Sequence, residues 1–187
     1  MQALVHQRGV SGEFTFSMLP RLHQTLEKAR TAGHPYKIVC ILGGTNDLSD
    51  DDNTPESIFA HLHQMYDLVL SHGALLAAIT IPESAFTDAE YVALRTGVNG
   101  HIKSFCAKNA ATTVCIDLEH HIPYFNADGV KNDELWDDGL HMTPKGYDEF
   151  GQFVFNQLET KILELHGIGG IAVEKVVVPD IDGSGCA

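Results

Sequence analysis

Asp138 and His141 are the side chains in this 187-residue sequence whose types and spacing best suit chemistry. They stand immediately before Thr143-Pro144, a pair typical of helix starts. A carboxylate three residues before an imidazole can hold the ring in one tautomer and stabilise its protonated form, which leaves the other ring nitrogen free as a general base. The alternative is an acidic turn with an incidental histidine, since the sequence contains 11 histidines.

Two glycine-containing loops could supply hydrogen-bond donors to a developing oxyanion. Gly12, in the sequence RGVSG, has no side chain to block a ligand from its backbone N–H. Asn46, in the sequence GGTND, presents a side-chain amide that can donate to an oxyanion. Taken alone, the Asn46 loop is equally well explained as a plain turn, and for Gly12 alone a turn glycine is the favoured interpretation, because Gly, Asn and Asp all favour turns.

The elements that must position these loops alternate between strand and helix. Short apolar runs predict strands at residues 2–6, 37–42, 74–81 and 112–116. Helical spacing and cap residues predict helices at residues 17–32, 54–71, 87–108 and 143–166, with Thr87 and Glu90 as a capping box and a long irregular loop at 117–140. This order indicates an α/β fold with a parallel sheet, in which the loops after the strands carry any chemistry.

The segments RGVSG, GGTND and DGLHMTPKGY resemble, in this order, the second, third and fifth conserved blocks of the SGNH (GDSL-type) hydrolases. These are serine esterases and lipases with a three-layer α/β/α, flavodoxin-like fold, and the resemblance spans Gly9 to about Gly151. It implies hydrolysis of a small-molecule ester with no metal and no organic cofactor. It also implies that Gly12 and Asn46 form the oxyanion hole, that His141 is the general base and that Asp138 orients it.

The family's first block, Gly-Asp-Ser at the end of the first strand, carries the nucleophile. Only eight residues precede Gly9, and none of them is serine. We therefore expect the central first strand of the 2-1-3-4-5 sheet to be absent, the protein to be an N-terminally truncated product, and this chain to be inactive. The alternative is a non-catalytic protein, either a pseudoenzyme, a binding module or a gene fragment.

Other serines are weak candidates for the missing nucleophile. Ser11 and Ser49 lie in the two glycine-containing loops, whereas Ser17 is better placed to cap a helix. Ser184 follows an apolar run in the tail, which loosely resembles a permuted first strand but otherwise reads as an extension over an exposed sheet edge. We divide the chain into a hydrolase-type domain, residues 1–166, and a tail, residues 167–187.

Composition excludes several other classes of protein. With 12 basic and 25 acidic side chains the net charge is −13, which argues against binding to nucleic acid or an anionic membrane. The longest apolar run, Ala74–Ile81, is too short to span a bilayer. Few cysteines, read as buried free thiols, and no signal peptide favour a cytoplasmic protein. Scattered histidines and acidic residues are read as solvated charge rather than a metal site, and the oligomeric state is left open.

Overall fold

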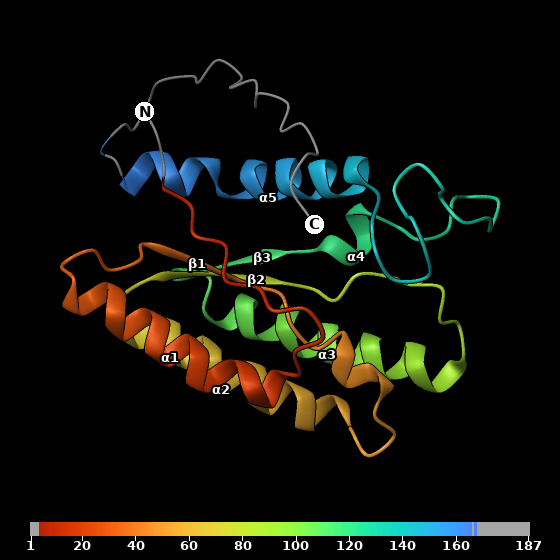
Figure 1. Cartoon of the computed structure of the whole chain (residues 1–187), viewed down its shortest axis with the longest axis horizontal. Helices are drawn as coiled ribbons and strands as arrows, with labels where there is room; N and C mark the ends of the chain where they lie inside the picture. The colour runs from red at the N-terminus through yellow and green to blue at the C-terminus, as the bar shows by residue number, and fades with distance from the viewer. Residues whose placement is uncertain (1–3, 166, 168–187) are drawn as a thin grey trace, which may run out of the picture.

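The computed structural model describes residues 4–165 and residue 167. In this part of the chain a parallel sheet of order β1-β2-β3 lies between two layers of helices (Figure 1). The strands are β1 (Ile38–Ile41), β2 (Leu75–Ile79) and β3 (Thr113–Ile116). The helices are α1 (Thr15–Thr31), α2 (Pro55–Ser71) and α3 (Ala89–Lys108) on one face, α5 (Pro144–Leu165) on the other, the short α4 (Leu118–His121), and the 3-10 turn η1 (Asn46–Ser49). The predicted α/β fold is confirmed.

The two helix starts predicted from Thr-Pro pairs are both correct. At α2 the Thr54 hydroxyl accepts from the Ser57 backbone N–H at 3.2 Å, and the Ser57 hydroxyl accepts from the Thr54 backbone N–H at 2.9 Å. At α5 the Thr143 hydroxyl accepts from the Gly146 backbone N–H at 3.1 Å. These bonds satisfy N–H groups that the first helical turn leaves without a partner, which is why the local sequence suffices to place both starts.

Three local predictions are wrong. The cap of α3 is Asp88, whose carboxylate accepts from the Tyr91 N–H at 2.8 Å, rather than a Thr87–Glu90 box. Ser17 lies inside α1 instead of capping it, because α1 already begins at Thr15. The loop predicted for residues 117–140 contains α4, one turn of helix directly after β3.

The predicted first strand also fails over its described residues, 4–6, which have no strand pairing. Leu4 and Val5 are 84% and 83% exposed, since no described segment donates or accepts the hydrogen bonds that a strand requires. The segment is held instead by His6, whose Nδ1 lies 2.8 Å from the Tyr36 hydroxyl. An apolar run alone therefore does not make a strand here.

The sheet has a buried middle and a less protected side. Leu76, Ala77 and Ala78 of β2 are fully buried between α1–α3 on one face and α5 on the other. Cys40 in β1 is exposed, which corrects the prediction of a buried thiol. β1 forms an edge of the described sheet, with hydrogen-bonded pairing only to β2.

No helix within the described residues is long and apolar enough to cross a membrane. Residues 168–187 lie outside the described part of the chain, and with them Ser184, Cys186 and the strand-like run Ile171–Val178. The division into a domain ending at residue 166 and a tail therefore stays a prediction.

Candidate active site

Asp138 and His141 form the pair that the sequence predicts. His141 Nδ1 lies 2.9 Å from Asp138 Oδ2, while Asp138 Oδ1 accepts from the backbone N–H groups of Leu140 at 2.6 Å and His141 at 2.7 Å. The backbone N–H of His141, followed by its side chain and the Leu140 N–H, holds the pKa of the Asp138 carboxyl well below its ordinary value. The carboxylate is thus kept ionised and aimed at one imidazole nitrogen, which leaves Nε2 for chemistry.

The loop that carries this pair is fastened to its surroundings through backbone carbonyls. Ala85 N–H donates to the Gly139 carbonyl at 2.8 Å, and the Tyr124 hydroxyl donates to the Asp138 carbonyl at 3.2 Å. Lys131 Nζ donates to the Asp137 carbonyl at 2.6 Å. Ala85 from a distant loop, together with Tyr124 and Lys131 from the preceding part of the same loop, therefore fixes the position of the Asp138–His141 segment. None of these supports was identified from the sequence, because each acts through a main-chain atom that sequence does not distinguish.

One hydrogen bond joins the two loops that carry the predicted oxyanion donors. Asn46 Nδ2 donates to the Glu13 carbonyl at 3.0 Å, one residue after Gly12. Gly12 has φ +72°, a left-handed conformation that favours glycine, and a Cβ added there would meet no neighbour within 4 Å. The two loops also border a cavity of about 120 Å³, lined by residues that include Val10, Glu13 and Asn46.

Asp47 is a structural residue of this site that sequence reasoning left as solvated loop charge. It is 2% exposed, and its carboxylate accepts from the backbone N–H of Thr15 at 3.1 Å and from the Thr15 hydroxyl. A carboxylate at the first residue of α1 offsets the partial positive charge of the helix N-terminus. Asp47 therefore ties the start of α1 to the loop that holds Asn46.

The structure places the predicted site residues at the same end of the sheet without joining all of them. The loops of Gly12, Asn46 and His141 all lie beyond the carboxyl ends of the strands, but no hydrogen bond links His141 to the other two. Among the described serines none hydrogen-bonds to His141. Ser49 instead donates to the Asn46 carbonyl at 2.7 Å, and Ser11 lies in an exposed turn.

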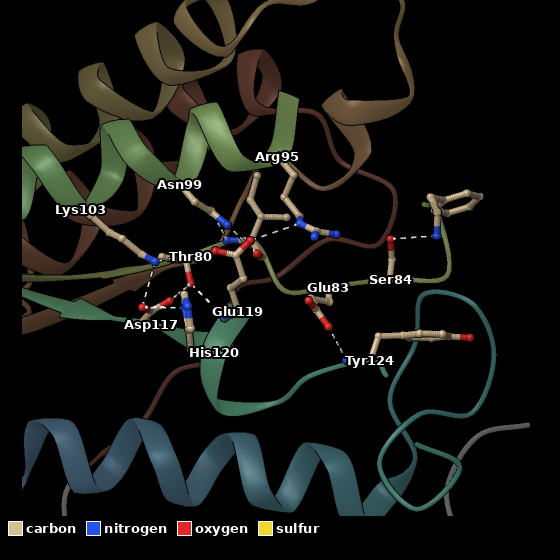
Figure 2. A network of polar contacts seen from close by, with 12 residues as sticks. Thr80, Glu83, Ser84, Arg95, Asn99, Lys103, Asp117, Glu119, His120 and Tyr124 are labelled. Atoms are coloured by element: carbon tan, nitrogen blue, oxygen red, sulfur yellow. Dashed lines mark hydrogen bonds and ion pairs between the residues drawn. The ribbon is translucent and has the colours of Figure 1, made fainter. Parts of the chain in front are cut away.

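A second aspartate–histidine pair with the same spacing lies in a different environment. His120 Nδ1 is 3.0 Å from Asp117 Oδ2, but Lys103 Nζ contacts the same carboxylate oxygen at 2.9 Å (Figure 2). Burial raises the pKa of Asp117, and the hydrogen bonds from Lys103 and His120 outweigh that effect, so the pKa is lowered overall. This carboxylate is therefore already compensated by a cation.

The charge network continues from Asp117 to Glu119. Glu119 Oε1 accepts from the nearly buried Arg95 at 3.3 Å, and Lys103 lies 3.7 Å from Glu119 Oε2. Asp117, Glu119 and His120 have ligand atoms within 4.8 Å of one another, but the two cations balance the two carboxylates. Since a metal ion would have to compete with Lys103 for Asp117, the cluster suits a structural role better than a metal site.

Comparisons with known proteins bear on the family and the fold of this chain. The model of the GDSL-like lipase/acylhydrolase family matches residues 1–149. A GDSL-like lipase from Bacteroides thetaiotaomicron has a similar structure, with TM-score 0.64 and 19% identity, over 82% of this chain and 75% of that one.

A carbohydrate esterase family 3 protein from Talaromyces cellulolyticus has a TM-score of 0.56 and 23% identity, over 83% of this chain and 69% of that one. An acetyl-xylooligosaccharide esterase from a Geobacillus species has a TM-score of 0.60 and 14% identity, over 90% of this chain and 74% of that one. At these identities the structures support the fold, and a search of curated proteins found no match. From the family model, which spans most of the sequence, it follows that the chain belongs to the GDSL-like lipase/acylhydrolase family.

Proposed function

We propose that this protein provides the general base and the oxyanion donors for hydrolysis of a small-molecule carboxylic ester. The observation that carries the proposal is the Asp138–His141 contact at 2.9 Å, with two backbone N–H groups fixing the same carboxylate. The His141 side chain is 62% exposed, so its Nε2 can reach a substrate. Family membership supports the reaction class.

The roles that we propose rest on the resemblance of the three segments to the family's blocks and on the chemistry of each group. His141 Nε2 takes the proton of a serine hydroxyl as its oxygen attacks the ester carbonyl carbon, and Asp138 stabilises the imidazolium that results. The tetrahedral oxyanion accepts from the Gly12 backbone N–H and from Asn46 Nδ2. His141 then protonates the departing alcohol, and water repeats the sequence to release the acid. Asn46 can serve because its amide has two N–H groups, and only one is used by the Glu13 carbonyl.

We further propose that the nucleophile comes from a Gly-Asp-Ser segment that the given sequence does not contain. None of the described serines hydrogen-bonds to His141, and Ser11 and Ser184 are the weak internal candidates. We expect this chain by itself to be inactive. A non-catalytic binding module is the second candidate. The observation in its favour is that none of the described serines hydrogen-bonds to His141.

The experiment compares two proteins. The first is the chain as given, and the second, called the extended chain, carries a Gly-Asp-Ser strand and a following helix before Met1. Hydrolysis of p-nitrophenyl acetate above buffer is expected only from the extended chain. Hydrolysis by the chain as given, abolished by His141→Ala, would mean that an internal serine acts. An extended chain that folds cooperatively but stays inactive would favour the binding module.

A further inference from the structure

Two cysteines face each other where the end of α3 packs on β3. The Thr113 hydroxyl in β3 donates to the carbonyl of Cys106 in α3 at 3.1 Å. At the other end of this contact, Lys103 Nζ lies 2.9 Å from Asp117 Oδ2 (Figure 2). Cys115 stands between Thr113 and Asp117, and because alternate strand residues share a face, its side chain points to α3 with that of Thr113. Cys115 accordingly packs against the buried cluster that contains Cys106.

The two thiols differ in exposure and in acidity. Cys106 is 4% exposed, whereas Cys115 is partly buried. A hydrogen bond between the thiols raises the pKa of Cys106 and lowers the pKa of Cys115, where it outweighs burial and the nearby Asp117 charge. Burial raises the pKa of Cys106 further, and Lys103 helps to lower the pKa of Cys115. Because the thiolate is the nucleophile, Cys115 is the better placed of the two to attack a reagent from solvent.

A buried hydroxyl lies beside this pair. Tyr66 of α2 is fully buried, and its ring centroid lies 5.2 Å from that of Phe105, the residue before Cys106. Within the described part of the chain, its hydroxyl is the buried side-chain oxygen that lacks a hydrogen-bond partner. Burial, followed by the charges that Cys106 and Cys115 carry as thiolates, raises the pKa of Tyr66, so its hydroxyl stays protonated and can donate. A donor held without a partner beside two thiols suits a sulfur that becomes negatively charged during a reaction.

We propose that Cys106 and Cys115 are a redox-active dithiol, which a low-molecular-weight disulfide such as oxidised glutathione converts into a disulfide between α3 and β3. The Cys115 thiolate attacks one sulfur of the reagent, whose S–S bond breaks. A mixed disulfide forms on Cys115, and one glutathione thiolate leaves and takes up a proton. Cys106 then loses its proton to solvent and attacks the Cys115 sulfur, which releases the second glutathione. The two cysteines lose two electrons in total, and the reagent is reduced to two thiols.

Tyr66 has a defined part in the second step. The Cys106 sulfur is buried, so its thiolate lacks the water that would otherwise stabilise it. The Thr113 hydroxyl already donates to the carbonyls of Cys106 and Asn109, which leaves the Tyr66 hydroxyl as the free donor that the described residues supply. The disulfide then ties α3 to β3 covalently, between two noncovalent contacts. This proposal does not depend on ester hydrolysis.

Oxidation of the folded chain by glutathione tests the proposal directly. Cys40→Ser and Cys186→Ser leave Cys106 and Cys115 as the only cysteines. After incubation with oxidised glutathione and alkylation in urea, mass spectrometry should find monomer that takes up no alkyl group, with a Cys106–Cys115 cross-link in the peptide digest. The melting temperature of this monomer should exceed that of the reduced protein by about 5 °C or more.

Three variants of this two-cysteine protein separate the roles of the groups. With Cys106→Ala, Cys115 should keep glutathione as a stable mixed disulfide. With Cys115→Ala, the buried Cys106 should react at least about ten-fold more slowly. Tyr66→Phe should slow closure of the mixed disulfide about ten-fold, the effect of losing one hydrogen bond to a charged group, without lowering the melting temperature of the reduced protein. Tyr147→Phe, at an exposed residue of α5, is the control and should close at the unchanged rate.

Other outcomes overturn the proposal. If both cysteines are alkylated after incubation, in a protein whose melting curve shows that it is folded, there is no redox-active dithiol. A cross-link that forms only between chains or only in urea would lead to the same conclusion. Faster reaction of Cys106 than of Cys115 would contradict the order of the two steps. An unchanged closure rate in Tyr66→Phe would remove the hydroxyl from the mechanism.

Discussion

Two aspartate–histidine pairs in this molecule share spacing and distance but differ in what surrounds the carboxylate. Asp138–His141 and Asp117–His120 are both three residues apart, with Nδ1 to Oδ2 distances of 2.9 and 3.0 Å. Asp117 is also paired with Lys103, whereas among the described residues Asp138 has His141 as its only charged partner. A carboxylate without another cation stabilises an imidazolium more strongly, so local electrostatics rather than spacing separates the candidate base from a structural pair.

The largest difference between the two pairs is expected in kcat when each histidine is separately replaced by alanine. In the extended chain, His141→Ala is expected to lower kcat for p-nitrophenyl acetate by roughly 10²–10⁴-fold, the usual contribution of a general base. His120→Ala, the matched control, should change kcat less than about two-fold, because its carboxylate keeps Lys103. Equal losses in steady-state assays would remove the distinction between the pairs.

For stability we expect the opposite order: a substitution in the network around Asp117 and Glu119 should matter more than one at Asp138. Arg95 is 6% exposed and contacts Glu119, so Arg95→Met leaves the partly buried Glu119 carboxylate with Lys103, at 3.7 Å, as its remaining cation among the described residues. We expect the free energy of unfolding to fall by about 3 kcal/mol in urea titrations. Asp138→Asn, at an exposed site that keeps its Oδ1 acceptor, should lower it less than Arg95→Met does. A fall in the free energy of unfolding for Asp138→Asn as large as that for Arg95→Met would mean that both pairs serve to stabilise the fold.

The pKa of each carboxyl sharpens the comparison. Because hydrogen bonds lower the pKa of Asp138 in the folded protein, its contribution to stability is present above about pH 3.9, the unfolded value, and is lost as pH falls through the folded value. NMR titration should therefore give an Asp138 midpoint below about 3.9. Lys103→Met should raise the midpoint of Asp117 and leave that of Asp138 unchanged, because Lys103 contacts only Asp117 of the two.

The smallest effect is expected where the Asp138 loop is held in place. Tyr124→Phe removes the hydroxyl that donates to the Asp138 carbonyl at 3.2 Å and keeps the buried ring. The lost hydrogen bond is worth about 1 kcal/mol in holding the loop in its catalytic position. A rise of this size in the activation free energy corresponds to about a five-fold fall in kcat. Tyr147→Phe, at a residue that is 52% exposed on α5, is the control and should leave kcat unchanged. A Tyr124 variant indistinguishable from the control would show that the loop holds its position without the bond.

The sequence suffices where a contact is local. The Thr54 and Thr143 caps and the Asp138–His141 pair join residues at most three positions apart, so spacing alone predicts them. It fails where the partner comes from a distant element. Lys103 reaches Asp117 from α3, and the buried Asp47 reaches back to Thr15, neither of which spacing reveals.

The need for a partner from elsewhere in the fold also limits the prediction of whole strands. The apolar run of residues 37–42 correctly predicts a strand, but the run at residues 2–6 is no strand over its described part. Both runs have strand composition, but within the described part of the chain only the first has a partner, β2, to complete its hydrogen bonds. Which runs pair is decided by their neighbours in space.

Labelling of the extended chain with diisopropyl fluorophosphate, followed by intact-protein and peptide mass spectrometry, tests most directly whether His141 activates a serine. A phosphorylating reagent of this kind modifies a serine, with loss of fluoride, only when a neighbouring base has activated it. One adduct on the Gly-Asp-Ser serine is expected in the extended chain and in its His120→Ala variant, and none in His141→Ala. An adduct that persists in His141→Ala, or that disappears in His120→Ala, would contradict the assignment of Asp138–His141 as the catalytic pair.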